Sequence, residues 1–174
     1  MKKLVKIGCL LLSFLTLSSC GHSEGEDCPA VASSIHNDVL FDVLDSNGNS
    51  LASDEDYIIN NLAFAETGGD KIPFSIVDAG ENKQISLRFP LPKESAMKYT
   101  ADKTSGYGES TLVVKVSGAK YKLKGLFHYT CTHPHFAEFG CNGIKLVEIK
   151  SNYSNVSVSE AGDSLKVTVC DMPK

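Results

Sequence analysis

Residues 111–129 read T-L-V-V-K-V-S-G-A-K-Y-K-L-K-G-L-F-H-Y, and this stretch decides the fold. Between Lys120 and Lys124, the apolar residues Tyr121 and Leu123 alternate with lysines. Such alternation is typical of a β-strand with one face in the protein interior and the other in water. Segments 111–117 and 121–129 are therefore predicted as strands, joined by a hairpin turn at Ser117-Gly118-Ala119.

The rest of the chain repeats this pattern in short segments. Strands are expected at 38–44, 72–77, 84–89, 144–149, 155–159 and 164–169, with turns at 47–48 and 160–163. Only residues 53–62 predict a short helix, with Ser53 as its N-cap and Asp56 three residues later. Many short strands with glycine-rich turns indicate one all-β domain. We expect a single antiparallel β-sandwich over residues 28–174, with a small barrel as the alternative.

The first twenty residues predict export and lipid attachment. Lys2, Lys3 and Lys6 precede an apolar run, 7–17, that is shorter than a membrane-spanning helix. Leu17-Ser18-Ser19-Cys20 is a lipobox, so we expect a signal peptide over residues 1–19 and acylation of Cys20. Several acyl chains anchor a protein durably, at about 0.8 kcal/mol per buried CH₂. A signal without lipidation and a short anchor helix are the alternatives.

The charge of the mature chain bears on its partners. Cleavage before Cys20 would remove three lysines and leave 155 residues, with 14 basic against 21 acidic residues and a net charge of −7. Binding to nucleic-acid phosphates needs a basic surface, so nucleic acid is not an expected partner. No other apolar run is long enough to span a bilayer, and the lipid is the membrane link that the sequence predicts.

Two segments carry a resemblance to a known class of proteins. Residues 20–27, the lipidated cysteine followed by G-H-S-E-G-E-D, are expected to form a flexible acidic tether. A lipobox with acids after it resembles exported lipoproteins of the Bacteroidota, where such acids accompany surface display. Gly21 after the cysteine resembles outer-membrane sorting. The resemblance implies a lipid-anchored protein of the cell outer membrane and leaves open which face it occupies.

The second segment, 41–51, reads F-D-V-L-D-S-N-G-N-S-L. It resembles an early segment of uncharacterised Bacteroidota lipoproteins with Ig-like or related β-sandwich domains. That resemblance implies the sandwich fold and no particular activity. Asp163-Ser164-Leu165 also resembles the short acceptor used for O-glycosylation of exported Bacteroidota proteins, with Ser164 as the modified residue.

Four cysteines remain in the expected domain. They are Cys28, Cys131, Cys141 and Cys170. An even number in an exported chain favours disulfides, although four cysteines allow three pairings. We favour Cys131–Cys141 as a local bridge and Cys28–Cys170 as a bridge between the two ends of the domain. A metal site that uses cysteines is the alternative.

Two patterns are candidate metal sites. His128, His133 and His135 lie close in sequence, and two or three imidazoles can hold zinc or copper; a plain polar loop is the alternative. Residues 45–56 partly match a calcium-binding loop, but Ser50 stands where that loop needs glycine. For residues 45–56 a plain polar turn is therefore the favoured interpretation.

The chain carries no hydrolase signature, because neither G-x-S-x-G nor H-E-x-x-H occurs. It has no tryptophan, and its tyrosines are scattered, so a sugar-binding platform is not indicated. We expect a lipid-anchored cell-envelope module that binds an unknown protein or carbohydrate ligand, without catalysis or cofactor. One alternative is a metal-binding protein or small metal-dependent enzyme at the histidine loop. Another is a structural, adhesin-like surface component whose edge strands pair with partners.

Overall fold

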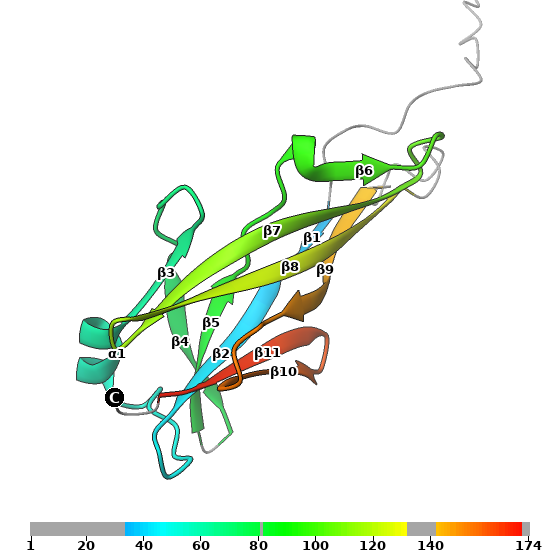
Figure 1. The fold of residues 1–174 in the computed structure, drawn as a ribbon. Coiled ribbons are helices and arrows are strands. Elements are labelled where there is room, and N and C mark those ends of the chain that lie inside the picture. Colours follow the sequence, from blue (N-terminus) through cyan, green and yellow to red (C-terminus); the bar gives the residue numbers. More distant parts are fainter. Residues whose placement is uncertain (1–33, 81, 132–141, 172–174) are drawn as a thin grey trace, which may run out of the picture.

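A computed structural model describes residues 34–80, 82–131 and 142–171 (Figure 1). The expected signal peptide, Cys20 and the acidic tether lie outside these residues. Within them the chain is mostly β-strand with one short α-helix, and the strands form two sheets that share one core. The predicted all-β class is confirmed.

Each sheet draws on strands from distant parts of the chain. The larger sheet has the order β1-β9-β8-β7-β3, and β6 also pairs with β7. These strands are β1 (Ser34–His36), β3 (Leu62–Glu66), β6 (Met97–Tyr99), β7 (Ser105–Val116), β8 (Ala119–Cys131) and β9 (Asn142–Lys150). The smaller sheet has the order β10-β11-β2-β5-β4. Its strands are β2 (Asp38–Leu44), β4 (Phe74–Ala79), β5 (Asn82–Arg88), β10 (Val156–Ala161) and β11 (Ser164–Cys170).

The predicted hairpin is the longest feature of the fold. β7 and β8 pair in antiparallel register from Val116↔Ala119 to Ser105↔Thr130, and Figure 1 shows the two strands side by side across the molecule. β7 begins at Ser105, six residues before the predicted strand, in a segment that contains Gly106 and Gly108. A Cβ at Gly106 would lie 2.7 Å from Tyr99 Cδ1, and one at Gly108 would clash with Met97 Sδ. These glycines therefore leave the space in which β6 packs.

The expectation of a purely antiparallel sandwich needs correction. β1 runs parallel to β9, and β2 runs parallel to β11. β1 and β2 follow each other with only Asn37 between them, yet belong to different sheets, so each sheet contains one of the two parallel pairs. Asn37 is 6% exposed, its Nδ2 donates to the Phe89 carbonyl at 2.6 Å, and its own carbonyl accepts from Phe89 N at 2.8 Å. These bonds fix the point where the chain changes sheet.

The predicted helix is present but starts one residue later than expected. α1 covers Glu55–Asn61, and its N-cap is Asp54, whose Oδ1 accepts from Tyr57 N at 2.9 Å. Ser53 is therefore not the cap. A single 3₁₀ turn, η1 (Glu94–Ala96), precedes β6.

Aromatic side chains fill the space between the sheets. Phe41 of β2 and Phe64 of β3 meet edge to face with ring centroids 5.0 Å apart, which joins the two sheets. Phe89 is fully buried and lies against the buried face of β8 at Gly125. A Cβ at Gly125 would lie 2.5 Å from Phe89 Cε1 and 2.9 Å from Leu146 Cδ1. The absence of a side chain at Gly125 therefore admits the Phe89 ring.

Replacing Gly125 with alanine should destabilise the domain by about 1–3 kcal/mol, because the buried Phe89 ring cannot move aside without strain. The matched control is Gly68→Ala, since the nearest atom to a Cβ there is Asp70 Oδ2 at 3.9 Å. Urea unfolding of both variants measures the difference. Equal stability of the two variants would show that the Phe89–Gly125 contact does not constrain the core.

Candidate functional site

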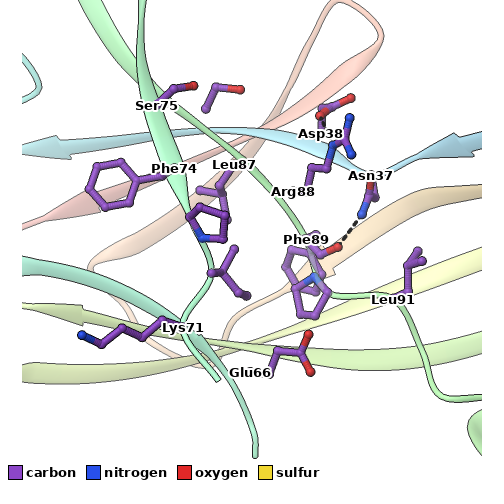
Figure 2. Close-up of a pocket in the computed structure, with 14 residues that line it drawn as sticks. Asn37, Asp38, Glu66, Lys71, Phe74, Ser75, Leu87, Arg88, Phe89 and Leu91 are labelled. Atoms are coloured by element: carbon purple, nitrogen blue, oxygen red, sulfur yellow. Dashed lines mark hydrogen bonds and ion pairs between the residues drawn. The ribbon is translucent and has the colours of Figure 1, made fainter. Parts of the chain in front are cut away.

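A cleft of about 760 Å³ lies beside β3 and β4. Each of these is the outermost strand at one end of its sheet. Figure 2 shows the side chains that line it. They come from three parts of the chain: residues 37–38, where the chain changes sheet; Glu66 with 71–75, between β3 and β4; and 86–91, at the end of β5. The cleft thus depends on the packing of the two sheets.

The inner surface of the cleft is apolar. Leu87 and Phe89 are buried, Ile72 and Phe74 are half-buried, and Leu91 remains 41% exposed at the rim. A concave apolar surface with a few polar groups around it is the usual form of a ligand site, because a ligand there loses contact with water.

Charged groups of both signs surround this apolar surface. Arg88 Nε lies 3.7 Å from Asp38 Oδ1, and these two side chains are 81% and 62% exposed. Lys71 and Glu66 lie on the other side of the cleft (Figure 2). An exposed ion pair contributes only about 0–1 kcal/mol, so these groups can exchange their contacts for those of a ligand at little cost.

The walls of the cleft are fixed by hydrogen bonds. One wall is held by the bonds between Asn37 and Phe89 described above. The opposite wall is a short turn in which Glu66 N donates to the Asp70 carbonyl and Ile72 N donates to the Phe64 carbonyl, each at 2.9 Å. A preformed cleft lowers the entropic cost of binding.

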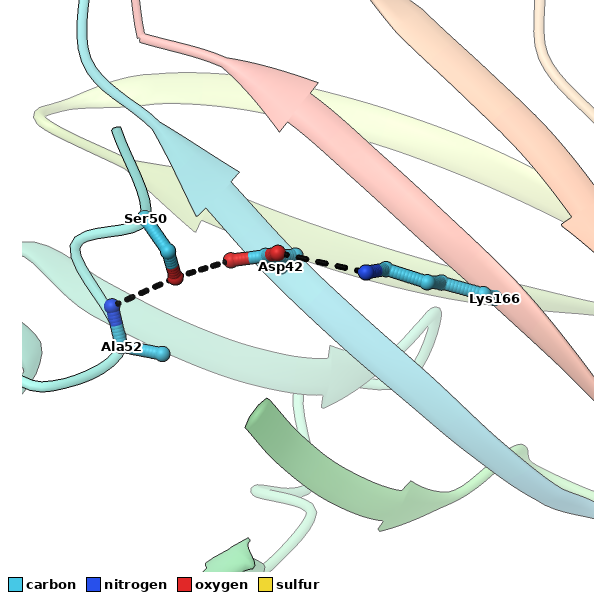
Figure 3. A network of polar contacts seen from close by, with 4 residues as sticks. All are labelled: Asp42, Ser50, Ala52 and Lys166. Atoms are coloured by element: carbon cyan, nitrogen blue, oxygen red, sulfur yellow. Dashed lines mark hydrogen bonds and ion pairs between the residues drawn. The ribbon is translucent and has the colours of Figure 1, made fainter. Parts of the chain in front are cut away.

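A second polar cluster surrounds Asp42 on the outer face of the smaller sheet (Figure 3). Asp42 Oδ1 accepts from Ser50 Oγ at 2.6 Å, and Asp42 Oδ2 lies 3.3 Å from Lys166 Nζ. Ser50 Oγ in turn accepts from Ala52 N at 3.3 Å. Because both carboxylate oxygens already have partners, the cluster ties β2 to β11 and to the loop after β2.

The partial calcium motif folds as a polar turn. The Asp45 carboxylate accepts from Asn47 N and Asn49 N at 2.8 Å each, and from Asn49 Nδ2 at 3.0 Å. Hydrogen bonds from Asn49, above all from its backbone, lower the pKa of Asp45. Asp56, the expected twelfth ligand, lies instead in α1. Both carboxylate oxygens of Asp45, the first expected ligand, thus already accept hydrogen bonds from N–H donors. The described part of the chain contains no cluster of three or more histidine, cysteine or acidic side chains that could hold a metal.

Of the three candidate histidine ligands, the structure describes only His128; His133 and His135 lie outside the described residues. His128 is on the outer face of β8, where its ring stacks on that of Tyr107 with centroids 4.5 Å and planes 11° apart. Its Nε2 lies 3.0 Å from Ser105 Oγ. His128 therefore already has partners on its own sheet, and the three-histidine site stays a prediction.

The candidate glycosylation residue, Ser164, is the first residue of β11 and pairs with Ala161 across the β10–β11 turn. Its side chain is half-buried and lines a hollow of about 150 Å³ together with His36 and Asp38. Modification of Ser164 stays a prediction.

The two cysteines that the structure describes differ in state. Cys131 is disulfide-bonded, and its partner lies outside the described residues, as does Cys141, so the local pairing stays a prediction. Cys170 is a free thiol, which speaks against the expected Cys28–Cys170 bridge. Cys28 itself lies outside the described residues.

The strand geometry explains why a bridge from Cys28 to Cys170 is difficult. Cys170 lies beside Leu44, at the far end of β2 from the start of β1. The ten steps from Ser34 to Leu44 cover up to roughly 33 Å at about 3.3 Å per residue, since β2 continues from β1 after Asn37. Cys28 precedes Ser34 by six residues, which reach at most about 21 Å.

Peptide mapping without reduction should therefore find Cys170 alkylated and Cys131 in a bridged peptide. Alkylation under denaturing conditions gives every free thiol equal access, and a reduced sample is the control in which both cysteines are labelled. A recovered Cys28–Cys170 peptide would contradict this assignment.

A third polar cluster joins the end of the chain to the sheets. Asp171 Oδ2 accepts from Tyr57 Oη at 2.6 Å and from Ser117 Oγ at 2.5 Å. The pKa of Tyr57 is raised to about 12, mainly because the phenol is partly buried and secondly because it donates a hydrogen bond to Asp171. Such a phenol is a poorer acid than a free tyrosine, so the cluster fits a structural link between α1, the β7–β8 turn and the C-terminal end of β11.

Removing the Tyr57 hydroxyl should lower the free energy of unfolding by about 1–2 kcal/mol below pH 10, where the phenol is protonated in both the native and the unfolded protein. The raised pKa means that the native state keeps a proton which the unfolded chain loses, so this stabilisation should fade as pH rises from about 10 to about 12. Urea unfolding of wild type and Tyr57→Phe at about pH 9 and about pH 11 measures the change. Tyr99→Phe is the control, since no hydrogen bond of its hydroxyl is found among the described residues. A stability difference between wild type and Tyr57→Phe that stays constant across this range would contradict the assignment.

Comparison with known proteins gives no relative for this chain: it matches no protein-family profile, no curated protein and no solved structure. Separately, among the described residues no helix is both long and apolar enough to cross a membrane.

Sequence reasoning did not find the cleft. Its residues come from three segments that the β-sheet topology brings together, and none of these segments carries a recognised motif. The one local signal is F-P-L-P at 89–92, where two prolines interrupt the alternating pattern beside an apolar pair.

Proposed function

We propose that the protein is a lipid-anchored module of the cell outer membrane, acylated at Cys20, that binds a ligand without catalysis in the cleft between β5 and the β3–β4 connection. The supporting observation is the cleft itself: about 760 Å³, apolar inside and charged at the rim. That volume falls in the range of about 300–1,000 Å³ typical of ligand sites. The lipobox supports the location, and the two facing sheets are compatible with an Ig-like or related sandwich.

The chemistry of the cleft favours a polypeptide ligand over a neutral sugar. Lys71 and Arg88 offer cations, Asp38 and Glu66 offer anions, and the apolar surface lies between them. A peptide segment carries apolar side chains and charges of both signs. In addition, β4 pairs only with β5 among the described residues, so its other edge can accept an extended peptide as a further strand.

The same edge also supports the structural alternative. β4 and β10 are the outermost strands of the smaller sheet, and exposed edges can pair with strands of other subunits. A structural subunit would use those edges whether or not the cleft is intact, so substitutions inside the cleft separate the two functions. The metal-dependent alternative rests on His128, His133 and His135, and the contacts of His128 with Tyr107 and Ser105 make it the weaker hypothesis.

Replacing Leu91 with serine should weaken retention of the native partner on immobilised protein by roughly tenfold, because an apolar contact at the rim of the cleft is lost. The matched control is Ile59→Ser: Ile59 is 76% exposed and lies on α1, outside the cleft. Partner retained from a detergent extract of the native envelope is quantified for both variants.

If Leu91→Ser and Ile59→Ser reduce the amount of retained partner equally, the cleft is not the binding site. Turnover of a substrate that is abolished by Lys71→Gln or Arg88→Gln would show that the site is catalytic. Retention that survives Leu91→Ser but is lost when Ile76→Pro blocks β4 would favour the structural alternative.

A further inference from the structure

One face of the larger sheet carries an excess of lysines, and we name it the lysine face. On β8, Tyr121, Leu123 and Phe127 point into the core, so the residues between them point outward. The strand register places outward residues of β6, β7 and β9 beside them. The exposed lysines of this face are Lys98, Lys115, Lys120, Lys122, Lys124, Lys145 and Lys150.

The charge of the lysine face is opposite to that of the chain as a whole. Its exposed acidic residues are Glu109 and Glu148, so seven lysines against two glutamates give it a net charge of +5. The chain that follows the expected cleavage site carries −7. Basic residues are therefore concentrated on one surface of an acidic protein.

The strand register sets lysines directly opposite one another. Lys115 pairs with Lys120, and Lys124 pairs with Lys150. Like charges at directly opposed positions destabilise a sheet. On this face the structure shows one ion pair among the described residues, between Lys150 Nζ and Glu148 Oε2 at 3.2 Å. The remaining lysines are not neutralised within the sheet, and a ligand with repeated negative charges would relieve their repulsion.

The lysine face also contains a hollow of about 570 Å³ next to β6. Two lysines, Lys98 and Lys124, and one acid, Glu109, line it together with Tyr107, Thr111 and Leu126, so the charged lining has a net charge of +1. Tyr107 is 51% exposed, and His128, which covers one face of its ring, does not line the hollow. On its other side, Tyr107 has Lys98 of β6 directly opposite it in the strand register, so a ligand in the hollow meets the ring and a cation together.

We propose that the lysine face binds an anionic polysaccharide, a chain of sugars that carry carboxylate or sulfate groups. A sugar ring packs against Tyr107 in the hollow. The row Lys120, Lys122 and Lys124, with about 6.6 Å between alternate residues of a strand, contacts successive negative groups. This site is separate from the cleft and does not depend on ligand binding there, but the choice of a polysaccharide rests on the proposed export of the chain.

Two features favour a polysaccharide over other polyanions. The aromatic ring lies in a hollow rather than on a protruding apolar surface, which suits a sugar ring better than a bilayer. The expected export of the chain places it away from nucleic acid. Both alternatives are nevertheless outcomes of the test.

The first experiment measures binding of alginate oligosaccharide, with neutral dextran of equal length as the uncharged control. Alginate should bind, dextran should not, and the affinity should fall as salt rises. Lys122→Gln/Lys124→Gln should weaken alginate binding about tenfold or more and lower the slope of log K against log[salt] by on the order of one per lost contact. The matched control, Lys83→Gln/Lys93→Gln, removes two lysines outside the lysine face and should change neither quantity.

The second experiment separates sugar recognition from charge alone. Tyr107→Ala should weaken alginate binding several-fold and leave binding of polyglutamate, a polyanion without sugar rings, unchanged. Thermal unfolding verifies that each variant is folded. The proposal is overturned if both lysine double variants lose affinity equally, or if Tyr107→Ala leaves alginate binding intact. Tighter binding of single-stranded DNA or of vesicles of anionic phospholipid than of alginate would also overturn it.

Discussion

The arrangement of the whole domain depends on the change of sheet at Asn37. The chain leaves the larger sheet after β1 and enters the smaller sheet at β2 without turning back. A buried amide at this point needs partners, and Phe89 supplies both a carbonyl and an N–H. The same residue inserts its ring against Gly125 between the sheets. One pair of residues thus holds the chain where it changes sheet, places a ring in the core and forms one wall of the cleft.

The parts of the fold that the sequence predicts are those in which one strand carries its own signal. The lysines of 120–124 alternate with buried residues, and together with the turn residues Ser117-Gly118-Ala119 they predict the hairpin. β1 and β6 have only three residues each and show no period. β3 follows α1 directly, so its Leu62 and Phe64 continue an apolar pattern that began in the helix. The parallel pairs cannot be predicted from local alternation, because they form between segments that are distant in the sequence.

The candidate surfaces show the same limit. The alternation of lysines on β8 is visible in the sequence, but only the strand register brings Lys115 and Lys150 beside them. The tyrosines look scattered along the chain. Register sets Tyr107 beside His128 on the outer face, while Tyr99 meets Tyr129 with ring centroids 5.4 Å apart. The cleft is formed by three segments that come together only because the chain changes sheet, so no local sequence pattern predicts it.

The two faces of the β7–β8 hairpin are under different physical constraints. Leu112, Val114 and Leu123 are fully buried, and their packing stabilises the hairpin whatever stands on the other face. The outward residues are free of that constraint, so a mixed-charge surface would serve folding and solubility equally well. Directly opposed lysines are a worse choice than such a mixture, because they repel each other. Their presence on a central strand, and not only on an edge where lysine blocks strand pairing, is therefore better explained by what the surface contacts than by the fold it belongs to.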